Sequence, residues 1–366
     1  MEKSQKNIGD WASENKFIQF VVRVGNFLPV VFIVLLVMWS YYAFVVRLCI
    51  LHLLNENSTQ GVIYLVIYHP LLLMMMWCYF VATFTSPGYP DDPISSKSSR
   101  LLTLPGTTIS SQHHPSEIHS SPEVKNTILL TKTGSSKQKP NIILDESGNP
   151  VSLGAIMVKQ SGEKRYCQKC QYDKPDRTHH CRVCKRCILK MDQLNNCIGF
   201  RNQKSFYLFV IWGSLYSLYI TIATIPPTVN YLQYSNEATI MSLDLNISFL
   251  ILIGGVFALS LLGFSIYHTS LLLSNQTTLE SLMTKQNFKM RETDEVTTGK
   301  LLNLYDIGKR QVHELIETMV MGPTWYLWFL PVGEPMGDGK TWLLNTARYS
   351  SLINSTDNLP GTPQTV

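Results

Sequence analysis

The stretch from Tyr166 to Phe200 reads YCQKCQYDKPDRTHHCRVCKRCILKMDQLNNCIGF and holds six of the eight cysteines of this 366-residue chain. Its potential metal ligands follow one another at short spacings: Cys167, Cys170, His179, His180, Cys181, Cys184, Cys187 and Cys197. Thiolate and imidazole groups are the usual ligands of zinc, which binds four of them tetrahedrally. Redox-active thiols also occur in Cys-x2-Cys pairs, but overlapping pairs around two histidines favour a metal site.

Apolar runs on both sides of this stretch are long enough to cross a membrane as helices. They have no interior Lys, Arg, Asp or Glu, which disfavours the alternative of buried helices in a soluble core. The runs cover residues 24–46, 61–82, 206 to Pro226–Pro227, and 247–273. We therefore predict an all-α integral membrane protein with four transmembrane helices. The cysteine-rich stretch forms a zinc-binding module between the second and third helices.

The distribution of Lys and Arg predicts the orientation in the membrane. Four precede the first run, one separates the first and second, 18 separate the second and third, none separates the third and fourth, and eight follow. Cytoplasmic loops carry an excess of basic residues, so both termini and the central loop are predicted to be cytoplasmic. That compartment is reducing, which favours metal ligands over disulfides. The net charge of +5 suits anionic lipid and phosphate-bearing ligands, and no nucleic-acid partner is expected.

Composition divides the chain further. We predict a cytoplasmic tail (1–23), two spans (24–82), a disordered linker rich in Ser, Pro, Thr and Gly (83–160), the cysteine-rich module (161–205), two more spans (206–273) and a cytoplasmic tail (274–366).

A helical period occurs within the last tail, at Val312, Leu315, Ile316, Met319 and Val320. The amphipathic helix that it predicts packs either against the module or, as we prefer, in the membrane interface. The preference rests on the aromatic residues that follow, namely Trp325, Tyr326, Trp328 and Phe329.

The cysteine stretch and the four spans around it resemble the DHHC protein S-acyltransferases (palmitoyltransferases). Thr85-Ser86-Pro87-Gly88 after the second span and NQTTLE (Asn275–Glu280) after the fourth resemble that family's flanking motifs. The resemblance implies that fatty acyl-CoA is the acyl donor and that cytoplasmic proteins bearing Cys are the acceptors. It also implies residence in an endomembrane, Golgi or ER, or in the plasma membrane. In the expected reaction a cysteine thiolate attacks the thioester, and the acyl-enzyme passes its chain to a protein cysteine.

Two zinc ions are implied by the same resemblance. The first would be held by Cys167, Cys170, His180 and Cys187, all of which are present. The second would use Cys181, Cys184, Cys197 and a histidine that this chain lacks. His179 or a water molecule is the candidate for the empty place. One complete and one incomplete zinc site are therefore predicted.

The missing histidine belongs to a larger departure from the family pattern, Met-Asp-His-His-Cys-Pro-Trp. Here Met191-Asp192 is followed by Gln193 and Leu194, so one residue replaces five. The nucleophilic Cys, its activating His and the second zinc's His are lost together. Asp192 remains as the orienting acid, and Thr278 matches the residue that supports it.

Cys181, within His179-His180-Cys181, is a poor substitute nucleophile. A metal-bound thiolate is weakly nucleophilic, and using it would dismantle the module.

Three further residues match substrate-binding positions of the family. Tyr216 on the third span matches a position near the closed end of the acyl cavity, although helix packing explains it equally well. Lys174 and Arg177 match positions near the phosphates of CoA, although a solvated basic face is the alternative. The segment Asn303–Gly308 resembles the start of the family's tail motif, but Val312-His313 stands where Asn-Trp is expected.

Two hypotheses about function follow. In the first, the chain is an enzyme and one exon boundary has been assigned slightly wrongly in its gene. The loss of four codons without a frameshift and the preservation of the rest of the module support this hypothesis. In the second, it is a pseudoenzyme that acts as a membrane scaffold or acyl-CoA-binding partner. The polypeptide as written is predicted to be inactive in acyl transfer under either hypothesis.

Overall fold

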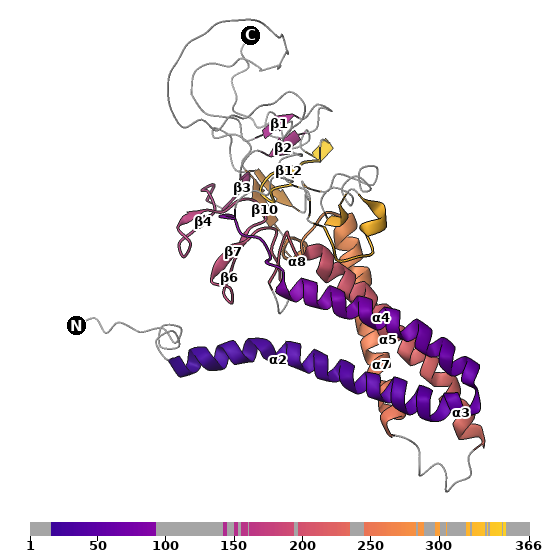
Figure 1. Cartoon of the computed structure of the whole chain (residues 1–366). Coiled ribbons are helices and arrows are strands. Elements are labelled where there is room, and N and C mark those ends of the chain that lie inside the picture. Colours follow the sequence, from indigo (N-terminus) through magenta and orange to yellow (C-terminus); the bar gives the residue numbers. More distant parts are fainter. Residues whose placement is uncertain are drawn as a thin grey trace, which may run out of the picture. The chain divides into compact units, whose positions relative to one another are not determined.

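The structure of the chain is a computed structural model, and it is mostly helical (Figure 1). It describes residues 16–92, 142–144, 150–152, 155–159, 161–193, 197–234, 245–282, 285–288, 297–300, 305, 320–322, 324–333, 335, 337–345 and 347–348.

The chain divides into two compact units. Unit 1 comprises Met1–Met76 and Val210–Ser265, and unit 2 comprises Trp77–Phe209 and Ile266–Val366.

Long apolar helices dominate the described residues (Figure 1). They are α2 (Lys16–Tyr41), which continues through the π-helix η1 (Tyr42–Leu53) and α3 (Leu54–Glu56), then α4 (Ser58–Phe84), α5 (Gln203–Tyr234) and α7 (Leu245–Leu273). In the part of the chain that the structure describes, four helices are long and apolar enough to cross a membrane. The prediction of four candidate spans is confirmed to that extent.

The third predicted span differs from the structure at its end. The sequence suggested a stop at Pro226–Pro227, whereas α5 continues through both prolines to Tyr234. Proline removes one backbone donor and still fits a helical φ. In an apolar environment, unwinding the helix would expose more backbone polar groups than the two donors that the prolines lack. The continuous helix is therefore the less costly arrangement.

Aromatic residues with hydrogen-bonded hydroxyls form the core of unit 1. The Tyr216 hydroxyl lies 2.8 Å from the Ser40 hydroxyl and 2.9 Å from the Tyr68 hydroxyl, and all three residues are buried. Phe44 stacks on Tyr68 with ring centroids 4.8 Å apart. The Tyr219 hydroxyl donates to the Tyr64 carbonyl at 2.9 Å. These contacts join η1, α4 and α5 without charged groups, as an apolar setting requires.

The cysteine-rich module in unit 2 is built from short antiparallel hairpins rather than helices. The pairs are β4 (Tyr166–Cys167) with β5 (Tyr172–Asp173), β6 (His179–Cys181) with β7 (Arg186–Ile188), and β8 (Asp192–Gln193) with β9 (Cys197–Ile198). The all-α prediction is therefore wrong for this part of the chain. Tight hairpins bring cysteines that are separated by two intervening residues to one point, which favours strands and turns where ligands converge.

Other short elements complete the described part of unit 2. One sheet contains β1 (Ile142–Leu144), β2 (Pro150–Ser152) and β12 (Trp342–Leu343), and another contains β3 (Met157–Val158), β10 (Lys285–Phe288) and β11 (Thr297–Lys300). The helical elements are α8 (Thr278–Leu282) and the 3₁₀ turn η4 (Trp325–Leu327).

A close backbone approach joins the module to the end of α4 and the start of α5. A Cβ on Gly199 would lie 2.5 Å from both the Pro87 carbonyl and the Ile188 side chain, so only glycine fits there. The Asn202 side chain accepts from the Gly199 N–H and donates to the Ala82 carbonyl. The position of the module relative to these helix ends is thus fixed by backbone contacts.

Candidate metal centres and the remnant of a catalytic site

The first predicted ligand group comes together in the structure. Cys167 and Cys170 lie on the β4–β5 hairpin, and His180 and Cys187 are cross-strand partners in β6 and β7. The His180 Nδ1 atom lies 3.5, 3.3 and 3.9 Å from the sulfurs of Cys167, Cys170 and Cys187. Three thiols and one imidazole converging on one point match the closed tetrahedral set of a structural zinc ion.

The second group contains three cysteines. The Cys197 sulfur lies 2.9 Å from that of Cys181 and 2.7 Å from that of Cys184. Among the His, Cys, Asp and Glu side chains that the structure describes, no fourth ligand joins this group. The donor set therefore fits an open site better than a closed tetrahedral one.

His179 does not fill the empty place. It directly precedes the first-group ligand His180 on β6, and its ring nitrogens do not lie together with the sulfurs of Cys181, Cys184 and Cys197. Burial lowers the pKa of His179 to about 4, with Arg165 adding a smaller effect, so its imidazole is neutral.

The two hairpins that each carry a Cys-x2-Cys pair, β4–β5 and β6–β7, repeat the same local geometry. Gln171, directly after Cys170, has φ +57°, and Lys185, directly after Cys184, has φ +55°. The left-handed residue closes each turn and aims backbone N–H groups at the preceding sulfur. The Cys184 N–H, for example, lies 3.4 Å from the Cys181 sulfur.

These N–H groups have an electrostatic consequence. Burial raises the pKa of Cys181, but the N–H groups of Cys184 and Val183 and the neighbouring thiols outweigh it and lower the pKa below the ordinary value of a thiol. The same balance lowers the pKa of Cys167. Each group thus has one thiol shifted toward the thiolate form that metals bind.

Asp192 lies at the end of the module, in contact with Thr278 as the sequence predicts. Its carboxylate accepts the Thr278 backbone N–H at 3.0 Å and the Thr278 hydroxyl as well. Asp192 is buried and begins β8, while Thr278 begins α8. The structure therefore brings the predicted acid and its supporting residue together.

A small cavity adjoins this carboxylate within unit 2. Asp192, Tyr207, His268 and Gln276 are among its polar lining residues, and Phe206, Leu271, Leu272 and Val320 are among its apolar ones. The His268 ring meets Phe206 edge-on at 5.4 Å. The cavity thus combines one carboxylate and one imidazole with an apolar wall.

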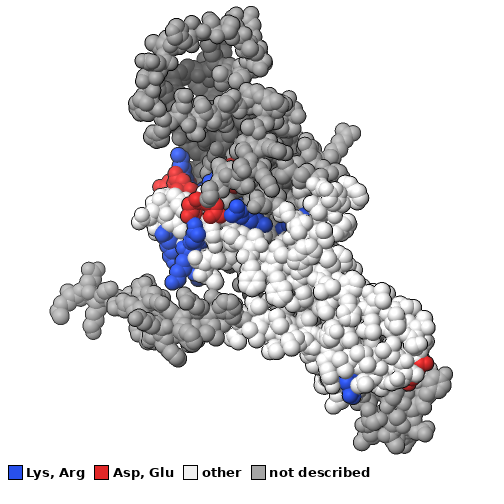
Figure 2. All heavy atoms as spheres, in the orientation of Figure 1, with Lys and Arg blue, Asp and Glu red and all other residues white. Residues whose placement is uncertain are grey.

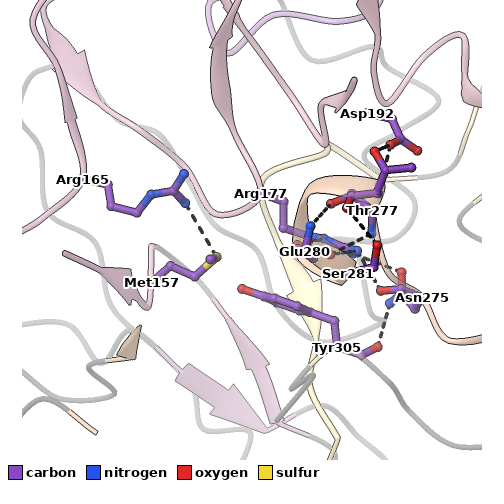
Figure 3. Close-up of polar contacts among 10 residues, drawn as sticks. Met157, Arg165, Arg177, Asp192, Asn275, Thr277, Glu280, Ser281 and Tyr305 are labelled. Carbon is purple, nitrogen blue, oxygen red and sulfur yellow. Dashed lines mark hydrogen bonds and ion pairs between the residues drawn. The ribbon is translucent and has the colours of Figure 1, made fainter. Parts of the chain in front are cut away.

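Arg177 lies inside unit 2, where Figure 3 shows it in contact with Glu280 and Asn275. Its guanidinium donates to both Glu280 oxygens at 2.9 and 2.8 Å and to the Asn275 side chain and carbonyl at 3.0 and 2.7 Å. It is 1 % exposed and lies between the Tyr305 and Trp342 rings, 4.8 and 4.7 Å from their centroids. A contact between Arg177 and a CoA phosphate, which stays a prediction, would require this network to open.

Charges complete the description of this network. Burial raises the pKa of Glu280, but Arg177 and the Thr277 N–H outweigh it, so the net pKa is lowered and Glu280 is ionised. Lys174, three positions before Arg177 in the sequence, is half-buried. In Figure 2, Lys and Arg gather over the cysteine hairpins, while the long helices are almost uncharged.

Comparison with known proteins adds to this geometry. Residues 160–285 match the family described as DHHC palmitoyltransferase. Human palmitoyltransferase ZDHHC20 is 30 % identical over 322 residues, which is 87 % of this chain and 76 % of that protein. Palmitoyltransferase ZDHHC15A of Danio rerio is 33 % identical over 327 residues, 88 % of this chain and 86 % of that protein. Mouse palmitoyltransferase ZDHHC2 is 31 % identical over 345 residues, which is 93 % of this chain and 80 % of that protein.

The chain belongs to the DHHC palmitoyltransferase family. The resemblance seen in the cysteine stretch is thereby confirmed. Membership, together with the four apolar helices, makes this an integral membrane protein with a cysteine-rich region that can bind metal.

Some residues of this DHHC protein were missed by sequence reasoning. The Lys204 ammonium donates to the carbonyls of Met321, Leu327 and Val332 at 3.0, 3.0 and 2.8 Å, which attaches a C-terminal loop to the first turn of α5. Backbone carbonyls have no sequence signature, so nothing pointed to this contact. The position of Tyr305 could have been noticed in the sequence, because this residue lies within the segment Asn303–Gly308 that resembles the family's tail motif. The predicted helical positions before Val320 lie outside the described residues.

Proposed function

We propose that this chain is a protein S-acyltransferase family member that keeps the membrane architecture and has lost the acyl-transfer step. The observation that supports the proposal is the site at Asp192. Its carboxylate is held by Thr278, but the residue that follows it in sequence is Gln193, which is neither base nor nucleophile. The nearest cysteine in sequence on either side, Cys187 or Cys197, belongs to a metal-ligand group.

The chemistry explains why this loss abolishes transfer. Acyl transfer from a thioester through an enzyme needs a thiolate that attacks the carbonyl carbon, with CoA leaving as its thiol. A neighbouring histidine takes the thiol proton, and a carboxylate orients that histidine. Here the carboxylate is in place, and the His268 imidazole lines the same cavity, but no cysteine is among the lining residues of that cavity, so no acyl-enzyme forms.

Restoring the missing segment tests the proposal. Gln193 is replaced by His-His-Cys-Pro-Trp in the full chain, and membranes are labelled with an alkyne palmitoyl-CoA. We expect no hydroxylamine-sensitive label on the natural chain and clear label on the restored one. A restored chain with His-His-Ser-Pro-Trp is the matched control and should stay unlabelled. Label on the natural chain within residues 166–200 would refute the proposal.

A displaced exon edge, the first of the two hypotheses drawn from the sequence, is the other candidate for the gene, because the rest of the module is kept. Sequencing the transcript across codons 191–195 separates the two. Recovery of codons for His-His-Cys-Pro-Trp would make the gene product an active palmitoyltransferase. Their absence leaves a pseudoenzyme that acts as a scaffold or acyl-CoA-binding partner in the membrane.

We place one zinc ion at the complete ligand group, Cys167, Cys170, His180 and Cys187, where it would hold the hairpins of the module together. We also place both termini and the module in the cytoplasm, on the basis of the Lys and Arg distribution. Fatty acyl-CoA would be bound with Lys174 near its phosphates and with Tyr216 at the far end of its chain. Hydrogen bonds from Tyr216 to Ser40 and Tyr68 support a closed end there. Cytoplasmic proteins bearing Cys are the partners.

A further inference from the structure

The group formed by Cys181, Cys184 and Cys197 has the donor set of a different metal from that of its neighbour. The first group offers three thiols and an imidazole, whereas this one offers three thiols alone among the residues that the structure describes. Zinc that keeps an open fourth position takes a water there. Whether water is held depends on polar partners around the site.

The described surroundings of the three thiols are largely apolar, with the Tyr89 hydroxyl as a polar neighbour of Cys184 and Cys197. Buried Ile188 and Met191 form a cluster with Cys181, against which Cys184, Cys197 and Tyr89 pack. The carboxylates that the structure describes at this end of the module already have partners, Asp192 with Thr278 and Asp91 with Arg186. These described neighbours offer little to hold a zinc-bound water, whereas they suit a soft ion that needs none.

Charge in the same hairpin matches three thiolates. Arg182, Lys185 and Arg186 alternate with the cysteines between Cys181 and Cys187 and are exposed. The Arg186 guanidinium lies 3.8 Å from the Tyr89 ring centroid, beside the group. Arg186 also pairs with Asp91, so Arg182 and Lys185 are the cations that offset the two net negative charges of three thiolates bound to one monovalent ion.

We propose that Cys181, Cys184 and Cys197 form a trigonal Cu(I) site. Thiolate ligands are soft and select Cu(I), and three of them complete its coordination without a fourth ligand. The loss of the second zinc's histidine thus changes the metal preference of the group rather than only weakening it. The proposal is independent of acyl transfer, because it concerns metal content alone.

The experiment uses the purified full chain in detergent, reduced and kept free of oxygen. Zinc is supplied first, a mild chelator removes what is weakly held, and one equivalent of Cu(I) is then added from a buffered complex. Metal content is measured by mass spectrometry, and copper coordination by X-ray absorption. We expect one zinc to remain and one Cu(I) to bind with three sulfur neighbours.

Three variants make the assignment specific. Cys184→Ser should lose the copper and keep the zinc, and the retained zinc shows that the module is folded. Cys49→Ser, at a cysteine outside both ligand groups, is the matched control and should keep both the zinc and the Cu(I). Gln193→His adds an imidazole at the residue whose backbone pairs with Cys197, and it should raise tightly held zinc to two per chain.

Three results would overturn the proposal. The natural chain could hold two zinc ions through the chelator step, it could release zinc as it takes up the first Cu(I), or it could bind no copper. Retention of copper by Cys184→Ser would also refute the assignment to these thiols.

Discussion

Arg177 shows how much depends on a single side chain in unit 2. Its guanidinium is fully buried between two aromatic rings and pairs with Glu280 of α8. A buried ion pair contributes little net stability against an apolar replacement, but removing one partner leaves a bare charge. Loss of Arg177 should therefore destabilise unit 2 mainly because Glu280 would be left as a buried, unpaired charge, and less because the attraction within the pair is lost.

A prediction follows for Arg177→Met. It should lower the free energy of unfolding of unit 2 by about 3–5 kcal/mol, because Glu280 is left buried and unpaired. The double variant Arg177→Met with Glu280→Met should recover part of that loss. Thermal unfolding in detergent measures both, with the half-buried Lys174→Met as the matched control. Equal losses for Lys174→Met and Arg177→Met would contradict the argument.

Lys190 gives a second prediction at this scale, because its buried amine faces Arg177 as well as carboxylates. Burial lowers its pKa from 10.5 to about 7, Arg177 adds to the shift, and Glu280 and Asp192 oppose it. Between about pH 7 and 10.5 the unfolded chain binds this proton and the folded chain does not, so stability rises with pH there. Below pH 7 both states are protonated, and no further change comes from this group.

The check compares the unfolding temperature of the natural chain with that of Lys190→Met from pH 6.5 to 10. The unfolding temperature of the natural chain should rise relative to that of Lys190→Met as the pH rises above 7. Lys185→Met, at an exposed site in the same module, should run parallel to the natural chain. Parallel curves for Lys190→Met would show that the amine is not held neutral.

At the scale of elements, the loop that carries η4 is organised by one cation at the start of α5. Lys204 donates to three carbonyls of the loop, and Trp325, Tyr326 and Phe329 remain largely exposed on it. Charge-assisted hydrogen bonds of this kind contribute roughly 1.5–3 kcal/mol each. Location of these aromatics in the membrane interface stays a prediction.

Lys204→Met should release this loop. We expect amide hydrogen exchange across residues 321–332 to rise by more than about tenfold, because local opening no longer breaks three bonds to an ammonium group. Arg201→Met is the control, since Arg201 makes a partly exposed ion pair with Asp92 at 3.3 Å. Unchanged exchange in Lys204→Met would mean that the loop is held by its side chains instead.

Elements also show what the sequence could reveal. The four spans and the first ligand group were found because hydropathy and Cys spacing are local properties of the chain. The passage of α5 through Pro226–Pro227 was missed because the apolar surroundings override a local breaking signal. The burial of Arg177 was missed because its partners lie about 100 residues away in sequence, and those partners decide whether a cation faces solvent.

At the scale of the whole molecule, both metal-ligand groups belong to unit 2, and the described core of unit 1 contains aliphatic side chains, aromatic rings and hydroxyls. Metal binding to such groups is coupled to the folding of the module that supplies the ligands. The hydroxyl contacts of Tyr216 in unit 1 require no metal. The two units should therefore respond differently when metal is withdrawn.

A strong chelator should unfold the cysteine-rich hairpins and leave the apolar helices formed. We expect rapid proteolysis within residues 155–201 of the stripped protein, while the helical circular dichroism signal changes little, because the helices satisfy their own backbone groups. Cys170→Ser should show the same protease sensitivity without chelator. Cys49→Ser, at a buried cysteine of η1 outside both ligand groups, is the control and should resist cleavage. A helical signal that fell in step with cleavage would mean that the spans depend on the module's metal, and the independence of the two units would have to be abandoned.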